Sequence, residues 1–113
     1  MANKHYGRAK AFANRALAIE PNNGNAINVK GDVIRYTKCD DGKAGQWSRL
    51  WLAVDYYSRA KAKDPSVAEK VNKRIAQCRA GYPENAEVFM FGLTEGEPYT
   101  HCNGEKTTVR LKK

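Results

Sequence analysis

The first helical segment of this chain ends in Ala16-Leu17-Ala18-Ile19-Glu20-Pro21-Asn22-Asn23. Small and apolar residues at helical spacing precede this proline and predict a helix over residues 6–19. Proline cannot continue a helix and asparagine favours turns, so the helix should end just before Pro21. A stretch of the same form, Ala60-Lys61-Ala62-Lys63-Asp64-Pro65, ends a later helix, and the two prolines are 44 residues apart. The chain therefore contains an internal repeat of helical segments.

Three further helices are predicted from apolar residues at helical spacing, over residues 25–37, 44–63 and 66–80. The middle one is the longest, and at 1.5 Å per residue it would extend roughly 30 Å. Trp47 and Trp51 belong to its apolar stripe. A stripe this broad suits a helix that packs between two neighbours, so both tryptophans are predicted to be core residues.

The last of these helices has a clear starting signal. Asp64 can act as an N-cap, and Pro65 occupies the first helical position, where its missing N–H costs nothing. Val71, Ile75 and Cys78 recur at helical spacing and should face inward.

The hydrophobic period changes after Pro83 and predicts strands. Val88-Phe89-Met90-Phe91 is a short apolar run of the kind found in buried strands. Residues 99–102 and 105–111 flank Asn103-Gly104, a strong signal for a hairpin with a two-residue turn.

That turn fixes a register. Cys102 would pair with Glu105, and Thr100 with Thr107. Because strand side chains alternate between faces, Cys102 would share its face, taken as the buried one, with Val109 and Leu111.

The positive charge lies mainly in the helical part. The chain carries 20 Lys and Arg against 12 Asp and Glu, a net charge of +8. Residues 1–83 contribute +9 and residues 84–113 contribute −1. The basic residues are spread evenly along the helices and are not clustered among aromatic residues, as nucleic-acid binding would favour. We therefore interpret them as solvated helix faces, and keep nucleic-acid binding as the alternative.

Length and motifs exclude several other classes. The 113 residues fit one domain. No apolar run approaches the roughly 18 residues of a membrane span, and the N-terminus lacks the apolar core of a signal peptide. His5 and His101 are too few and too scattered for a metal site or a catalytic base. His101 adjoins Cys102, but neighbouring strand residues point to opposite faces and cannot easily share a proton. We expect no catalytic residues, no metal, no cofactor and no small-molecule substrate.

The repeated segments share a spacing of small and aromatic residues. Ala9-x3-Ala13-x2-Ala16-x4-Pro21 matches Ala53-x3-Tyr57-x2-Ala60-x4-Pro65 at every offset. This pattern resembles the second helix of a tetratricopeptide repeat, whose period is about 34 residues. Gly31 matches the small position of that repeat where its two helices cross closely. The surplus of about 10 residues over that period falls in the turn between the helices, about residues 37–46, where a solenoid tolerates insertions.

The resemblance implies a mainly α fold. Residues 1–83 would form an antiparallel stack of helical hairpins, about four helices in all, with residues 66–80 as the terminal capping helix. Residues 84–113 would form a small β-hairpin or sheet packed on the helices.

The tail carries a second resemblance. Its pattern is similar to the C-terminal segments of large bacterial cell-envelope tetratricopeptide proteins. The matching residues are Glu87, Val88, Phe89, Gly92, Leu93, Glu95, Gly96, Tyr99, Thr100, Cys102, Glu105, Thr107, Thr108, Val109 and Arg110. This resemblance implies that the chain is a piece of a larger protein, in the periplasm or associated with the envelope, and that upstream repeats precede it. A cytoplasmic location is the alternative.

The oxidation state of the three cysteines depends on that location. In a cytoplasmic protein Cys39, Cys78 and Cys102 would all be free thiols. In an envelope protein, a disulfide between Cys39 and Cys102 would pin the β tail to the helices, although geometry and not sequence decides such a pairing. Cys78 lies on an apolar stripe and is predicted to be a small core residue.

A repeat stack offers surfaces for binding. The first helix of each unit lines the concave face, which could hold an extended peptide of another protein. The Lys and Asn clamp that some family members use for C-terminal carboxylates is not reproduced. The alternative is an ordinary solvated face that binds no peptide, and the sequence favours neither of the two. The predicted face comprises Asn25, Asn28, Asp32, Arg35, Tyr36, Glu69, Asn72, Lys73 and Arg79.

The sequence thus predicts a non-enzymatic module that binds a protein or peptide, or upstream repeats of the same parent protein. A basic helical domain that binds nucleic acid is the runner-up. A terminal cap that only seals the solenoid is the third option.

Overall fold

A computed structural model of the chain describes residues 6–37 and 42–112. Within them it is mainly helical, with a small antiparallel sheet near the C-terminus, which confirms the predicted fold class. The described elements are α1 (Tyr6–Ile19), α2 (Gly24–Tyr36), α3 (Gly42–Lys63), a 3₁₀ turn (Pro65–Val67), α4 (Ala68–Ala80), α5 (Asn85–Met90), β1 (Pro98–Thr100) and β2 (Lys106–Thr108).

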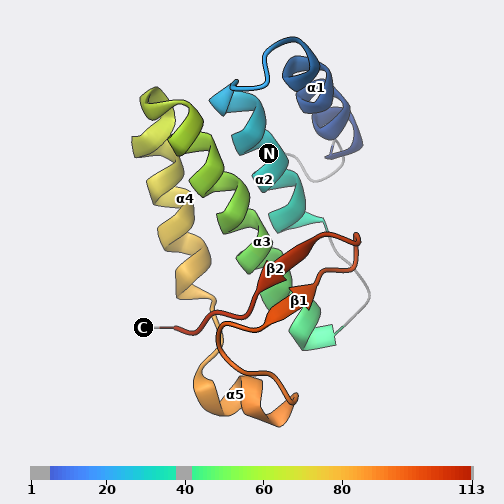
Figure 1. Cartoon of the computed structure of the whole chain (residues 1–113), viewed down its shortest axis with the longest axis vertical. Coiled ribbons are helices and arrows are strands. Elements are labelled where there is room, and N and C mark those ends of the chain that lie inside the picture. The colour runs from blue at the N-terminus through green and yellow to red at the C-terminus, as the bar shows by residue number, and fades with distance from the viewer. Residues whose placement is uncertain (1–5, 38–41, 113) are drawn as a thin grey trace.

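Helix α3 is the centre of the molecule. Figure 1 shows α1 to α4 side by side as an antiparallel stack, with α2 and α4 on either side of α3 and with α1 packed against α2. Trp51 and Tyr57 of α3 are completely buried, and Trp47 is nearly so. Val71, Ile75 and Cys78 of α4 are buried as predicted. The long helix therefore packs between two neighbours, as its broad apolar stripe indicated.

Two glycines allow the helices to approach closely. A methyl group on Gly31 would lie 2.6 Å from the ring of Tyr57, so only glycine fits where α2 crosses α3. A methyl group on Gly24 would lie 2.5 Å from Cβ of Asp64. The predicted close crossing at Gly31 is confirmed.

Side-chain caps mark where the helices begin. The Asn23 side chain accepts a hydrogen bond from the Ala26 N–H at 3.0 Å and starts α2. Asp64 accepts one from the Ser66 N–H at 3.1 Å, with Pro65 next in the chain. The predicted start after Asp64 is correct, although the first turn is 3₁₀ and α4 proper begins at Ala68.

The predicted inserted turn, residues 37–46, is wrong in its second half. Helix α2 ends at Tyr36, but α3 already begins at Gly42, and residues 38–41 lie outside the described part of the chain. The early start is stabilised by the tail, because Trp47 packs edge-on against Phe91 with ring centroids 5.4 Å apart. Part of the insertion therefore lengthens a helix.

The predicted strand Val88-Phe89-Met90-Phe91 is also wrong. Residues Asn85–Met90 form helix α5, which begins with a capping box in which the Glu84 N–H donates to the Glu87 carboxylate at 3.0 Å. Val88 is its buried residue. An apolar run this short fits a helix or a strand equally well, and here the capping box of Glu84 and Glu87 favours the helix.

The hairpin forms with a register one residue away from the predicted one. Tyr99 pairs with Thr107 and Thr100 with Lys106, because the loop has three residues and ends at Gly104 with φ +92°. Cys102 is consequently exposed, whereas His101 is buried. Val109 does lie on the buried face as predicted.

Candidate functional site

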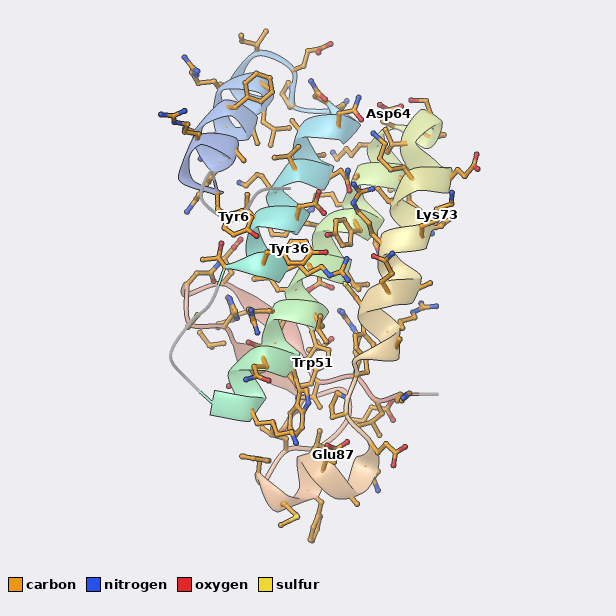
Figure 2. All side chains as sticks on the ribbon, turned by 180° about the vertical axis from the view of Figure 1, so that it is seen from behind. Tyr6, Tyr36, Trp51, Asp64, Lys73 and Glu87 are labelled. Carbon is orange, nitrogen blue, oxygen red and sulfur yellow. The ribbon has the colours of Figure 1, made fainter. Side chains whose placement is uncertain are left out.

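The nine residues of the predicted concave face do not share one surface. Five of them line a groove of about 540 Å³ between α2 and α4, called here the α2–α4 groove. Figure 2 shows Tyr36 and Lys73 on these two helices. The groove is lined by Asp32, Arg35, Tyr36, Ser66, Glu69, Lys70, Lys73, Arg74 and Gln77.

The other four predicted residues lie elsewhere. Asn72 and Arg79 project from α4 into a different groove, between α3 and α4. Asn28 is buried. Asn25 is exposed and accepts a hydrogen bond from Nζ of Lys70 at 3.1 Å. The structure therefore brings five of the nine predicted residues together in one groove.

Polar contacts bridge the α2–α4 groove. Asp32 accepts hydrogen bonds from the Tyr57 hydroxyl and from Nε of Arg74, the latter at 3.0 Å. Arg35 donates to Gln77 at 2.9 Å. Burial and then the hydrogen bond to Asp32 raise the pKa of Tyr57 far above its usual value, so its hydroxyl remains a proton donor at neutral pH. The contacts of Asp32 with Arg74 and of Arg35 with Gln77 connect α2 and α4.

The rim of this groove is basic and partly aromatic. Arg35, Lys70, Lys73 and Arg74 outnumber the acidic Asp32 and Glu69. The Arg35 guanidinium also lies 4.9 Å from the ring of Tyr36, which in turn stacks on Tyr6 at 6.3 Å. The arrangement favours an acidic ligand with an apolar or aromatic side chain.

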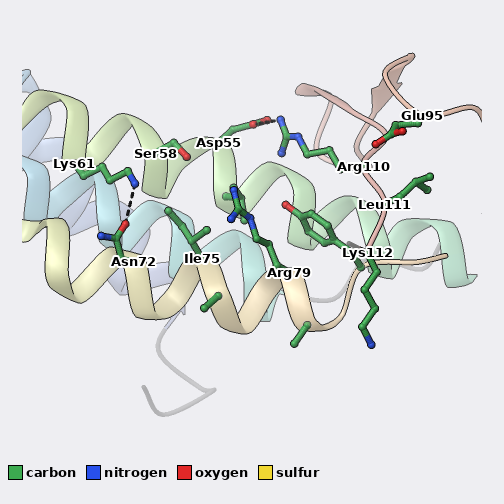
Figure 3. Close-up of a pocket in the computed structure, with 14 residues that line it drawn as sticks. Asp55, Ser58, Lys61, Asn72, Ile75, Arg79, Glu95, Arg110, Leu111 and Lys112 are labelled. Atoms are coloured by element: carbon green, nitrogen blue, oxygen red, sulfur yellow. Dashed lines mark hydrogen bonds and ion pairs between the residues drawn. The ribbon is translucent and has the colours of Figure 1, made fainter. Parts of the chain in front are cut away.

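The second groove, the α3–α4 groove, is larger, at about 970 Å³. Figure 3 shows two of its polar contacts, the ion pair between Asp55 and Arg110 and the 2.8 Å hydrogen bond from Lys61 to Asn72. Asp55 also accepts a hydrogen bond from Thr107 at 2.6 Å. Asp55 and Arg110 hold the tail on α3. A ligand in this groove would therefore have to compete with contacts that stabilise the fold.

A third pocket of about 430 Å³ lies among α1, α2, α3 and the hairpin. The Tyr56 hydroxyl donates to the Glu105 carboxylate there, and Nζ of Lys30 lies 5.5 Å from the Tyr56 ring centroid. Burial, and then the hydrogen bond to Glu105, raise the pKa of Tyr56 to about 12. Tyr56 therefore ties the hairpin to α3.

Sequence reasoning missed a buried Ser–His pair. Oγ of Ser48 lies 2.6 Å from Nδ1 of His101 and also donates to the Gly45 carbonyl at 2.7 Å. Because the hydroxyl has one proton, both contacts form together when Ser48 donates to Gly45 and Nδ1–H of His101 donates to Ser48. Both side chains are buried, so the pair attaches the hairpin to α3. Nothing in the spacing of Ser48 signals this contact.

The separation predicted for His101 and Cys102 is wrong. Nε2 of His101 lies 3.5 Å from Sγ of Cys102, because strand alternation does not extend into the loop that Cys102 opens. Cys102 is disulfide-bonded, and Cys78 is a free, buried thiol whose pKa is raised by burial. Cys39 lies outside the described residues, so its pairing with Cys102 stays a prediction.

Within residues 6–37 and 42–112, no cluster of three or more His, Cys, Asp or Glu is arranged to hold a metal ion. In the same part of the chain no helix has the length and apolar character needed to cross a membrane. Comparisons with protein-family models, with curated proteins and with solved structures give no significant match.

Proposed function

We propose that the chain is a non-enzymatic, tetratricopeptide-like interaction module that binds an extended acidic segment of a partner protein in the α2–α4 groove. The observation that carries this proposal is the excess of cations over carboxylates along a groove between two helices. A groove of this kind can hold an extended peptide through charge-assisted contacts to its side chains and backbone.

Three features of the groove support a peptide ligand. Lys73 is exposed on the rim, and Tyr36 is half-exposed beside it. The contacts between Asp32 and Arg74 and between Arg35 and Gln77 hold α2 and α4 at a fixed separation, so little ordering is needed on binding. Nucleic-acid binding remains the alternative, because the same cations could contact phosphates.

Charge reversal on two sides of one helix tests the proposal. The probe is a short fluorescein-labelled peptide of alternating Glu and Leu, measured by fluorescence anisotropy. Lys73→Glu should weaken its binding at least about tenfold, equivalent to about 1.4 kcal/mol. Arg79→Glu is the matched control, because it makes the same charge change on α4 but faces the α3–α4 groove. Its effect should stay within about twofold.

A labelled DNA duplex in the same assay separates the two functions. Tighter binding of the duplex than of the peptide, with a steep salt dependence and equal losses in both variants, would favour nucleic-acid binding. Absence of peptide and DNA binding alike would favour a terminal cap that binds nothing.

We further propose an oxidising location, in the periplasm or associated with the cell envelope, with the cytoplasm as the alternative. The disulfide-bonded state of Cys102 supports it, because such bonds persist in oxidising compartments. Thermal melting with and without reductant is the test. An unchanged melting temperature would count against a stabilising disulfide in this protein.

A further inference from the structure

Apart from Tyr36, the large apolar side chains that are exposed among the described residues lie on α1 and at α5. Among the described residues, Phe12 and Ile19 of α1 are 63% and 83% exposed, and Phe89 and Met90 of α5 are 78% and 84% exposed. Figure 1 places α1 and α5 at opposite ends of the longest axis, which measures 43 Å. Two separated apolar patches of this kind indicate two interaction sites, because large exposed apolar residues commonly mark such sites.

The patch on α1 forms one face of the helix. At 100° per residue, Arg8, Phe12, Arg15 and Ile19 point in similar directions, away from Ala13, which is buried. Helix α1 carries three basic residues and no acidic one. We call this basic and apolar surface the α1 face.

The patch on α5 has the opposite charge. Residues 84–97 contain four Glu and no Lys or Arg, although Glu87 lies 3.8 Å from Nζ of Lys43 and Glu95 lines the α3–α4 groove. Val88 is buried, and Phe91 packs against Trp47, so Phe89 and Met90 are held on the outside of an anchored helix. We call Phe89 and Met90, with Glu84 and Glu87 at the start of the same helix, the α5 tip.

We propose that two copies of this chain associate head to tail, with the α5 tip of one copy seated on the α1 face of the next. Each surface supplies apolar side chains, and their charges are complementary. The two surfaces cannot meet within one molecule, because they lie at opposite ends of it. The contact is therefore heterologous and would build a chain of molecules. Glu84 and Glu87 at the tip also disfavour an anionic membrane as the binding partner. The inference is independent of the α2–α4 groove.

Sedimentation of complementary variants tests this arrangement. The wild-type protein should show a mass that rises with concentration at about 0.1 M salt and rises less at about 1 M, where the screening length falls from about 10 Å to about 3 Å. Phe12→Asp destroys the α1 face, and Phe89→Asp destroys the α5 tip. Both side chains are exposed, so the substitutions leave the core intact. Each variant alone should lose at least about tenfold in association constant.

Mixing the two variants gives the decisive result. The intact tip of Phe12→Asp can still bind the intact face of Phe89→Asp, so the mixture should form a species of about 25 kDa, twice the 12.7 kDa of one chain, and nothing larger. Asn14→Asp is the matched control, because it adds the same charge on another side of α1 and should associate like the wild type.

Three results would overturn the proposal. The first is a wild-type protein that stays monomeric at all concentrations. The second is an associating wild type whose two variants give no dimer when mixed, since the contact would then be a symmetric one. The third is a loss of association in Asn14→Asp as large as that in Phe12→Asp.

Discussion

The helical stack and the C-terminal tail differ in how far they depend on polar contacts. Between the helices, the contacts are made by completely buried side chains such as Tyr57 and Val71. The tail also buries Val88 and Val109 in this core. In addition, it makes hydrogen bonds with Ser48, Trp51 and Asp55, three residues that share one stripe of α3. Apolar burial has no preferred direction, whereas hydrogen bonds need a specific geometry. The stack should therefore supply most of the stability, and the tail should open first.

The largest expected effect comes from Trp51, the residue of α3 that contacts both the helical stack and the tail. Trp51 is completely buried, its ring lies 5.7 Å from that of Tyr99 in the tail, and its Nε1 donates to the Arg110 carbonyl at 3.0 Å. Trp51→Ala should lower the free energy of unfolding by about 3–5 kcal/mol, as large-to-small changes in cores do. Urea denaturation followed by circular dichroism measures it.

A matched change at an exposed apolar side chain provides the reference. Ile19→Ala should cost less than about 0.5 kcal/mol in the dilute protein, because Ile19 is almost fully exposed. Similar losses in Trp51→Ala and Ile19→Ala would contradict the view that burial along α3 dominates stability.

A smaller effect should be confined to the tail. Asp55 accepts hydrogen bonds from Thr107 and pairs with Arg110, and both it and Arg110 are partly exposed. Asp55→Asn should therefore cost about 1–2 kcal/mol. Amide hydrogen exchange should rise in the tail, at the Val109 and Gly96 amides that bond to Glu97 and Val109, before it rises in the helices.

Asp32→Asn is the counterpart in the stack. Asp32 likewise accepts from a hydroxyl and pairs with an arginine, but both partners are helical. Its substitution should speed exchange in α2 and α4 and leave the tail amides unchanged. Equal acceleration of both regions in either variant would mean that the chain opens as one unit.

The same division explains which features could be predicted from the sequence. The bounds of α1 to α4 follow from local signals to within two residues, namely from apolar spacing and, for α4, from the cap at Asp64. In the tail, the short sequence left two alternatives open. Val88 could belong to a helix or a strand, and the loop ending at Gly104 could have two or three residues. The loop choice moved the register by one residue and exchanged His101 for Cys102 on the buried face.

The candidate site was predicted only in part for a related reason. Helical spacing identified which residues of α2 and α4 could be exposed, but not how far each helix is rotated in the stack. That rotation buries Asn28 and turns Asn72 and Arg79 toward the α3–α4 groove. Phe12 shows the converse, because it belongs to the apolar set of α1 yet is exposed. Tertiary packing determines both the rotation of the helices and the exposure of Phe12, and no local sequence pattern encodes it.

The smallest expected effect isolates one contact between the two regions by its pH dependence. Tyr56 of α3 donates to Glu105 of the hairpin, and its pKa is raised to about 12. Because the folded pKa lies above the unfolded value near 10, this contact contributes fully to stability below about pH 10 and is lost as the pH rises toward 12. Tyr56→Phe should remove that dependence, so the stability gap between wild type and variant should narrow by about 1 kcal/mol between about pH 10 and 11. Urea titrations at several pH values measure the gap, with Tyr36→Phe as the exposed control. A gap that stays constant with pH would show that the Tyr56 hydroxyl does not couple the hairpin to α3.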